Sequence, residues 1–501
     1  MRANPESDPD VPSAFARIAW LSLVWVLLST GCASVSPWNQ RFVRVETPNF
    51  VVTSSFGEDA ARALARDLET FHAGALYALG LPPDARLPER TRVMAFDDRG
   101  FGRPFATRGE AASLVPAVDA PILTILAPGT FAERVNADVR QRYARRLLRA
   151  LSKERPPLWY AEGRAQVAGT IRVSGTVAEI GRIHPEHARA TADWKRVGLA
   201  DAFDVTRLDD RSRASRREFE AASWALVHTI LFDSPRKADG RRALERVRVA
   251  FESGRPGALS SAVAALGARR ALAERVWTHV GSKTHRVDRV QVAGFEPGTI
   301  ALRSLSPGEA REALARLALD LGRPALALEY FERALEPRDE DVEAGRAVAL
   351  FRLERVEEAR RVVANLQWDL VSPERSVELE LARARADAEA REESLARVLA
   401  ILERADPARG AAARAWLELA RLLERARERV TPAGEGITAA RCLARAQAVG
   451  TGALEVDLVA AELDAREGRG RAAAFEAREV VSRSHDAKLR ERARVYLESA
   501  D

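Results

Sequence analysis

The chain has 501 residues, of which 47% are hydrophobic and 30% are charged. A chain of this size and composition can bury a sizeable core and divides into more than one domain, which excludes a wholly disordered protein. Its net charge of +6 arises from 78 basic residues interspersed with 72 acidic ones. So small an excess does not indicate a nucleic-acid-binding protein, and we expect no nucleic acid among its partners.

The N-terminus carries a short apolar segment followed by a cysteine. The apolar run from Ile18 to Leu28 follows Arg17 and is too short for a comfortable bilayer span. The small residues at 29–31 then precede Cys32. This arrangement resembles a bacterial lipoprotein signal, which implies removal of residues 1–31 and acylation of Cys32. An uncleaved signal anchor and an ordinary secretory signal are the alternatives.

Acylation would place the protein on a membrane surface, because each buried methylene group contributes about 0.8 kcal/mol. Ala33 stands where an inner-membrane retention signal has Asp, so the resemblance implies the outer membrane of the bacterial cell envelope, facing the periplasm. The second of the two cysteines is Cys442, and no intramolecular disulfide remains once Cys32 is acylated. We expect Cys442 to be a small buried helix residue, with a reactive thiol as the alternative.

Residues 41–127 combine strand-like and helical patterns. A long helical pattern over 59–79 is flanked by β-rich runs at 42–53, 91–96 and 122–126. The pattern predicts a small mixed sheet with a helix packed on it, which is an α+β beginning.

Helical spacing dominates from about residue 130 onward. One apolar stripe ends at Pro156 and Pro157, which stop the helix, and consists of Val135, Val139, Tyr143, Leu147 and Leu151. A hairpin is expected around 170–181, and further helices near 219–231, 241–253 and 272–280. Helical periodicity is lost over 283–306, which we interpret as a linker.

Two segments on these helices carry a recognisable pattern. Residues 141–145 read Gln-Arg-Tyr-Ala-Arg, and residues 157–165 read Pro-Leu-Trp-Tyr-Ala-Glu-Gly-Arg-Ala. The second segment resembles the Trp-x-x-Glu-Gly-x-Ala helix of gluzincin metallopeptidases of the peptidase MA-like kind, and the first lies where that family has His-Glu-x-x-His. Residues 44–53 resemble the family's Thr-Pro-Asn-Phe strand entry, and residues 219–228 resemble its Phe-Tyr-x-x-Ser-Trp-x-x-x-His helix. The resemblance covers about residues 41–282.

The resemblance implies that the zinc site is degenerate. It places Gln141 and Arg145 at the two His positions, Arg142 at the general-base position and Glu162 at the third ligand. An Arg guanidinium stays protonated and repels a dication, and a Gln amide oxygen is a poor zinc ligand. We therefore expect a pseudopeptidase with no metal and no catalytic residue.

The alternative is a zinc metallopeptidase with rearranged ligands drawn from His184, His187 or His72. Residues 184–187 read His-Pro-Glu-His, and the proline favours a surface turn over a metal site. His72 and His228 are expected to be packed or capped structural residues. No Walker loop, Gly-x-Ser-x-Gly elbow or Cys-x-x-Cys pair is present in the sequence, so we expect no cofactor.

A basic stripe follows the helix that carries the degenerate motif. Arg142, Arg145, Arg146 and Arg149 are spaced i, i+3, i+4 and i+7 and share one helix face. Such a face is a candidate site for a lipid phosphate or a peptide carboxylate, since Arg binds both bidentately. A solvated face, partly paired with acids such as Glu162, is the alternative.

The C-terminal part resembles tetratricopeptide repeats. The small and aromatic packing positions of one repeat are matched by Ala315, Ala318, Gly322, Ala327, Phe331 and Ala334. Further copies are indicated at 350–361, 398–402 and 466–473, with a period of about 32 to 36 residues. The resemblance implies an all-α solenoid, whose groove suits a peptide or a partner helix.

These observations predict a lipoprotein with an α+β gluzincin-like domain followed by an all-α tetratricopeptide-like solenoid. The expected divisions are a signal peptide (1–31), a tether (32–40), the degenerate peptidase domain (41–282), the linker (283–306) and the repeats (307–501). We expect the cleft and the repeats to bind a protein or peptide, and Cys32 to contact the membrane. A purely structural envelope protein is a further alternative.

Overall fold

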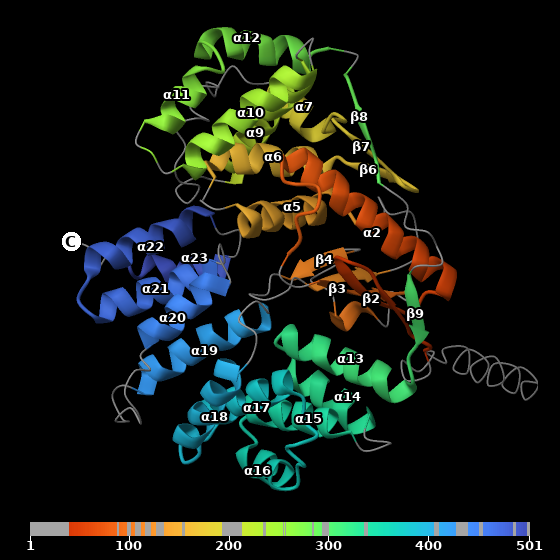
Figure 1. Ribbon diagram of the computed structural model, residues 1–501, viewed down its shortest axis with the longest axis vertical. Helices are drawn as coiled ribbons and strands as arrows, with labels where there is room; N and C mark the ends of the chain where they lie inside the picture. The colour runs from red at the N-terminus through yellow and green to blue at the C-terminus, as the bar shows by residue number, and fades with distance from the viewer. Residues whose placement is uncertain are drawn as a thin grey trace, which may run out of the picture. The chain divides into compact units, whose positions relative to one another are not determined.

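The computed structural model describes residues 40–87, 90–97, 102–105, 112–115, 122–126, 135–152, 156–192, 213–233, 237–253, 255, 257–282, 285–292, 300–334, 339–404, 410–426, 439–449, 454–483 and 487–497. Cys32, the expected signal peptide and the tether up to residue 39 lie outside these ranges. The described chain is mixed α/β, with a sheet near its N-terminus and a mostly helical remainder (Figure 1). None of its helices has both the length and the apolar character that a bilayer span requires.

A six-stranded sheet forms the N-terminal layer. Its order is β4-β5-β3-β2-β1-β9, and it consists of β1 (Val43–Glu46), β2 (Phe50–Ser54), β3 (Thr91–Phe96), β4 (Ala112–Val115), β5 (Ile122–Leu126) and β9 (Ala301–Ser304). β2, β3 and β5 run parallel, whereas β4, β1 and β9 join their neighbours in antiparallel pairs. The three strand-rich runs expected from the sequence are therefore confirmed as strands.

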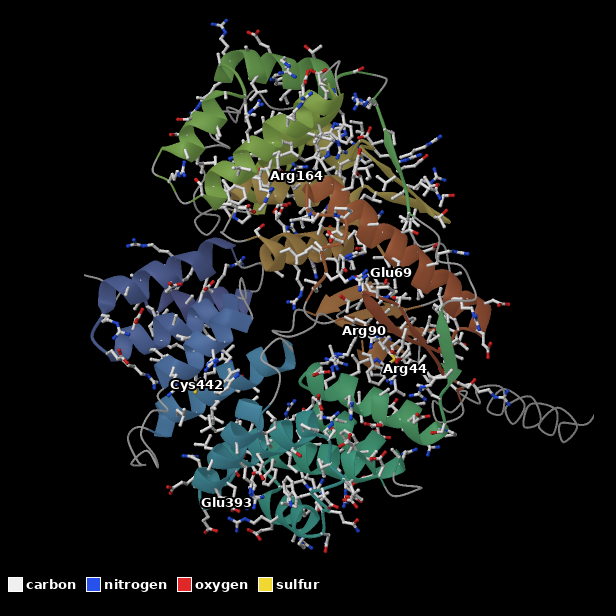
Figure 2. The ribbon with its side chains drawn as sticks, viewed as in Figure 1. Arg44, Glu69, Arg90, Arg164, Glu393 and Cys442 are labelled. Carbon is white, nitrogen blue, oxygen red and sulfur yellow. The ribbon has the colours of Figure 1, made fainter. Side chains whose placement is uncertain are left out.

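Helix α2 (Glu58–Leu79) packs on this sheet through a buried apolar face that includes Leu64, Leu68 and Leu76. It ends at Gly80, whose φ of 72° is the left-handed conformation that glycine adopts without steric cost. The buried carboxylate of Glu69 accepts hydrogen bonds from the backbone N and the side-chain Nδ2 of Asn49, at 2.8 and 2.7 Å (Figure 2). These bonds hold α2 against the turn that enters β2.

The same helix contacts a second, three-stranded antiparallel sheet. This sheet has the order β6-β7-β8 and consists of β6 (Arg172–Ser174), β7 (Val177–Ile180) and β8 (Asp288–Gln291). The first two strands form the expected hairpin, which is confirmed. α2 also contacts α5 (Ala137–Leu151) and α6 (Leu158–Gly169), the two helices that carry the motif residues.

The segment expected to be a linker, 283–306, contains two of these strands. β8 pairs with β7, and β9 pairs with β1 so that Arg303 lies opposite Arg44 and Leu302 opposite Val45. Both strands are short edge strands with mostly exposed or half-buried side chains. They lack the alternation that marks a strand in sequence, and their partners lie far away along the chain, so local pattern does not reveal them.

Between the hairpin and β8, the described chain contains the helices α7 (Pro185–Ala192), α9 (Arg213–Phe232), α10 (Lys237–Glu252), α11 (Ala258–Ala264) and α12 (Arg269–Val280). α9, α10 and α12 correspond to the three helices expected from the sequence. α11 was not expected. It is only seven residues long, none of them fully buried, and its partly buried Leu259, Ala262 and Val263 pack against the core.

The C-terminal part of the described chain is helical throughout. Its helices are α13 (Pro307–Asp320), α14 (Pro324–Ala334), α15 (Glu340–Arg352), α16 (Val356–Ala364), α17 (Pro373–Ala386), α18 (Arg391–Arg404), α19 (Gly410–Ala426), α20 (Ala439–Val449), α21 (Leu454–Arg466), α22 (Gly470–Arg483) and α23 (Ala487–Arg494). The helices pack in consecutive pairs: α13 with α14, α15 with α16, α17 with α18, α19 with α20, and α21 with α22. The first helix of each pair also contacts the first helix of the next pair, and α21 contacts α23.

Small residues let these helices pack closely. Ala315, Ala318, Ala327 and Phe331 are fully buried. A Cβ on Gly345 of α15 would lie only 2.4 Å from Phe331 Cζ of α14, so this contact requires glycine. In α20, Cys442 is 1% exposed, and burial raises the pKa of its thiol to about 12 (Figure 2). The prediction of a small buried helix cysteine is confirmed, and the thiol is protonated at neutral pH.

Candidate functional site

The candidate site lies where α5 packs against α6. α5 begins at Asn136, whose side chain accepts a hydrogen bond from the backbone N of Val139 at 3.0 Å. Its predicted stripe of Val139, Tyr143 and Leu147 is buried. α6 follows Pro157, which is compatible with the start of a helix because proline lacks an N–H group.

Two residues singled out by the sequence resemblance, Arg145 and Glu162, meet directly. Arg145 Nε donates a hydrogen bond of 2.9 Å to Oε2 of Glu162, and Arg145 Nη2 donates a second one to Oε1. The side chains are only 19% and 6% exposed. Burial by itself lowers the pKa of Arg145, but the charge and hydrogen bonds of Glu162 outweigh it and raise that pKa above its ordinary value.

The pair continues into a buried chain of hydrogen bonds. Gln166 Nε2 donates to Glu162 Oε1 at 2.7 Å, and Gln166 Oε1 lies 2.7 Å from Nε2 of His187. Because the amide oxygen can only accept, His187 carries its proton on Nε2. Burial, and then the neighbouring His184, lowers the pKa of His187 to about 3, so this imidazole is neutral at physiological pH. Gln166 was not singled out in the sequence, and His187 was considered only as a replacement zinc ligand in the alternative of a rearranged site.

The structure corrects the expectation of a surface turn at 184–187. Pro185 is the first residue of α7, a position that proline suits because its missing N–H would have no helical partner there. His187 is buried, its ring stacks on that of His184 at 3.8 Å between centroids, and it lies 5.8 Å from the ring of Trp224. The proline therefore marked the start of a helix and not a loop.

Two glycines allow the surrounding helices to approach. A Cβ on Gly163 would lie 2.3 Å from the backbone oxygen of Ser223 in α9, and a Cβ on Gly169 would lie 2.5 Å from Cγ of Gln141. Gln141 is buried in this contact with the last turn of α6. The Glu-Gly part of the motif thus has a packing function, since Gly163 admits the backbone of α9 beside Glu162.

The four arginines of the basic stripe have different surroundings. Arg142 is exposed and Arg146 is half-buried, whereas Arg145 turns inward to Glu162. The side chain of Arg149 lies outside the described part of the structure. The stripe therefore does not present all of its charges to one ligand, because Arg145 is committed to an internal carboxylate.

The neighbouring Arg140, one of the basic residues of this stretch, has a structural role that the sequence did not reveal. This buried residue donates from Nη1 to the backbone oxygen of Ile171, and burial lowers the pKa of its guanidinium to about 10. The hydrogen bond links α5 to the second residue after α6, so the role of Arg140 is to hold these two segments together.

The remaining histidines of interest lie in other surroundings. His72 Nδ1 lies 2.8 Å from Tyr143 Oη, and burial lowers the pKa of His72 to about 4. Tyr143 and Arg145, two residues apart on α5, point to opposite sides of the helix, so His72 and Glu162 lie on different sides of it. His228 in α9 is buried between the backbone oxygen of Gly181 at 3.0 Å and Nε2 of His279 at 2.8 Å. Both are packed residues, as expected.

The donor set does not fit a zinc ion. Glu162 is engaged by Arg145 and Gln166, and the guanidinium of Arg145 stands beside it where a metal would have to bind. Within the described ranges, no group of three or more His, Cys, Asp or Glu residues is placed to hold a metal ion. Chemically, the arrangement is an ion pair of Arg145 and Glu162 that is linked through Gln166 to the neutral imidazole of His187.

Comparisons with known proteins provide no relative for this arrangement: no family model, curated protein or solved structure matches the chain.

Proposed function

We propose that this protein binds a polypeptide partner and does not hydrolyse it. In this proposal, residues 41–282 are a peptidase MA-like domain of the gluzincin type that has lost its zinc site. Residues 307–501 are a tetratricopeptide-like solenoid that serves as a scaffold. Acylated Cys32 anchors both to the bacterial envelope, at the outer membrane and facing the periplasm.

The bidentate pairing of Arg145 with Glu162 carries the proposal. The resemblance assigns these two positions to zinc ligands, and a guanidinium bound to the third ligand supplies a positive charge in place of the dication. Arg145 cannot give up its proton at physiological pH, so the pair cannot activate a water molecule as a metal-bound hydroxide does. A domain that cannot activate water in this way can still bind a polypeptide, which is why we propose binding without hydrolysis.

The turns between the C-terminal helices support the solenoid. The turn before α14 contains Gly322 with φ of 69°, the turn before α16 contains Glu354 with φ of 60°, and the turn before α22 contains Gly468 with φ of 75°. A left-handed residue thus recurs at the equivalent place in three helix pairs. Repetition of one helix-turn-helix unit, with contacts between neighbouring units, is the organisation of a repeat solenoid.

Metal analysis tests the proposal directly. The mature chain with Cys32→Ser, purified without tag histidines or chelators and supplied with zinc, should retain no stoichiometric metal. A triple variant, Gln141→His, Arg142→Glu and Arg145→His, restores the ligand pattern opposite Glu162. It should bind zinc in a way that depends on Glu162, because the helix pair already places position 145 against Glu162 and packs position 141 on the last turn of the same helix.

Two outcomes would contradict the proposal. Stoichiometric zinc in the unaltered chain, lost with Glu162→Gln, would favour the alternative of a zinc metallopeptidase with rearranged ligands such as His184 or His187. A folded triple variant that binds no zinc would show that the helix pair lacks peptidase geometry. Circular dichroism of each variant supplies the folding control.

A further inference from the structure

The C-terminal helices enclose a groove whose lining is mainly apolar. It measures about 440 Å³ and lies between α17, α18 and the segment that precedes α17. Its apolar wall consists of Trp368, Val371, Pro373, Ala400 and Ile401. Leu370, next to Val371 in the chain, is 62% exposed. The size falls within the usual range for binding pockets, about 300 to 1,000 Å³.

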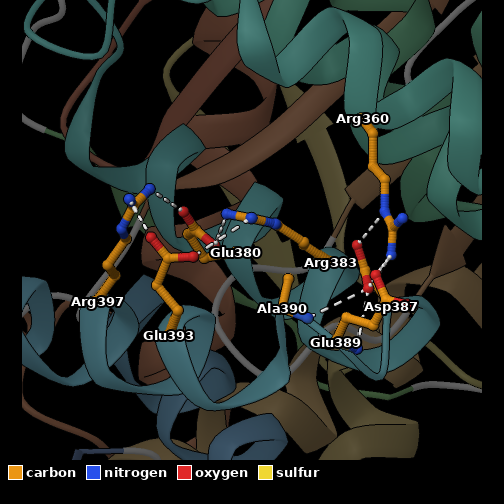
Figure 3. A network of polar contacts seen from close by, with 8 residues as sticks. All are labelled: Arg360, Glu380, Arg383, Asp387, Glu389, Ala390, Glu393 and Arg397. Atoms are coloured by element: carbon orange, nitrogen blue, oxygen red, sulfur yellow. Dashed lines mark hydrogen bonds and ion pairs between the residues drawn. The ribbon is translucent and has the colours of Figure 1, made fainter.

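A buried carboxylate lines the same groove. Glu380 of α17 is 0% exposed, and its Oε1 accepts a hydrogen bond of 3.0 Å from Arg397 Nη1 (Figure 3). Its Oε2 is also buried and has no hydrogen-bond donor, although it forms an ion pair with Arg383 Nη1 at 3.6 Å, which is too far for a hydrogen bond. A buried acceptor without a donor is uncommon and unfavourable, so an incoming N–H group would be stabilised there.

The charges around Glu380 are already balanced. Glu393 pairs with Arg397 at 2.5 Å and with Arg383 at 3.4 Å, which leaves two carboxylates and two guanidinium groups in one network (Figure 3). Arg397 also lies over the ring of Trp368, 5.3 Å from its centroid. An additional charge in the groove would have no partner of opposite sign, which disfavours both basic and acidic ligands.

We infer that this groove binds an uncharged polypeptide segment that places an apolar side chain against Trp368 and Ile401. A backbone N–H of that segment donates to Glu380 Oε2. A polypeptide fits better than a lipid chain, because an acyl chain offers no hydrogen-bond donor for the carboxylate. The inference rests on the proposed polypeptide-binding function of the repeats and adds to it one location and one ligand chemistry.

The test uses the mature chain with Cys32→Ser, labelled with 5-fluorotryptophan. The ligand is a pentapeptide of three alanines, one leucine and one phenylalanine, with an acetylated N-terminus and an amidated C-terminus so that it carries no charge. Millimolar peptide should shift the fluorine resonance that is missing from Trp368→Phe. Ala400→Arg should weaken binding at least about tenfold, because the new side chain fills the groove. Ala396→Arg is the matched control, since Ala396 is also exposed on α18 but does not line the groove, and it should bind normally.

A second comparison isolates the hydrogen bond. N-methylation of the peptide backbone removes its donors and should weaken binding about tenfold. Equal binding of the methylated peptide, or stronger binding of peptides with an added lysine or glutamate, would overturn the stated chemistry. Equal binding to Ala400→Arg, or no binding of any peptide, would overturn the location.

The remaining outcome concerns a second copy of this chain as the occupant. Light scattering that detects a dimer of the unaltered chain, lost in Ala400→Arg, would overturn the inference in favour of self-association. None of these results depends on the zinc measurements. Peptide binding in the groove can therefore be disproved while the pseudopeptidase proposal stands, and the pseudopeptidase proposal can be disproved while peptide binding in the groove stands.

Discussion

Arg145 of α5 and Glu162 of α6 are joined by two hydrogen bonds, the longer of them 2.9 Å from Nε to Oε2. The two residues lie on consecutive helices and come from the two segments that resemble the peptidase pattern. The pair places opposite charges in a largely buried position, where each ion needs the other to offset its loss of hydration.

Removal of one partner should therefore be far more harmful than removal of both. We expect Glu162→Leu to lower the free energy of unfolding by about 3 kcal/mol, because it leaves the Arg145 charge buried and unpaired. The double variant Arg145→Met with Glu162→Leu should recover most of that loss. Urea unfolding followed by circular dichroism measures both, with the exposed Arg142→Met as the control. A single variant no less stable than Arg142→Met would show that the pair is not buried as described.

Gly163 should tolerate no side chain. A Cβ there would lie 2.3 Å from the backbone oxygen of Ser223, so Gly163→Ala should force α6 and α9 apart and cost about 2 kcal/mol or more. Gly57→Ala, at a position with no atom near the added Cβ, should cost less than about 1 kcal/mol. The shift in thermal midpoint between the two variants measures the difference. Equal midpoints would place α9 further from α6.

Acid should destabilise the folded chain below about pH 6.5. Burial lowers the pKa of His187 and of His228 to about 3, and that of His72 to about 4. In the unfolded chain these groups bind protons at their ordinary pKa of about 6.5, so protons favour the unfolded state and stability is lost as the pH falls. Between its pKa in the folded chain and its pKa in the unfolded chain, each histidine lowers the free energy of unfolding by about 1.4 kcal/mol for every unit by which the pH falls.

Urea unfolding at a series of pH values measures this slope. His187→Gln should make it shallower by the contribution of one histidine, because glutamine can still donate to Gln166 but does not titrate. An unaltered chain whose stability does not change between about pH 6 and pH 4.5 would contradict the burial of these imidazoles.

Glu354 should be replaceable by glycine with a gain in stability. Its φ of 60° is the left-handed conformation that carries a steric cost for residues with a Cβ. We expect Glu354→Gly to raise the free energy of unfolding by about 0.5 to 1 kcal/mol, after allowance for the greater freedom of glycine in the unfolded chain. Glu357→Gly, on the exposed side of α16, should lower it by a similar amount. The same sign for both variants would argue against a left-handed turn before α16.

Local pattern determined most of the secondary structure. The stripe of Val139, Tyr143 and Leu147, the β-rich runs of the sheet and the small residues of α13 and α14 were all readable from local sequence. The contact between Asn49 and Glu69 is an example of what local sequence does not reveal. Both residues fall in segments identified from the sequence, but only the packing of α2 on the sheet brings the carboxylate to the Asn49 amide.

By itself, the sequence determined that residues 141–145 cannot supply zinc ligands, since that conclusion needs only the chemistry of Gln and Arg side chains. The tertiary structure alone decided which side chains surround Arg145 and Glu162. Arg145, Glu162, Gln166 and His187 come from three helices, and no spacing along the chain encodes their meeting. Strands β8 and β9 were also decided at this level, because an edge strand with little buried surface takes its conformation from a distant partner.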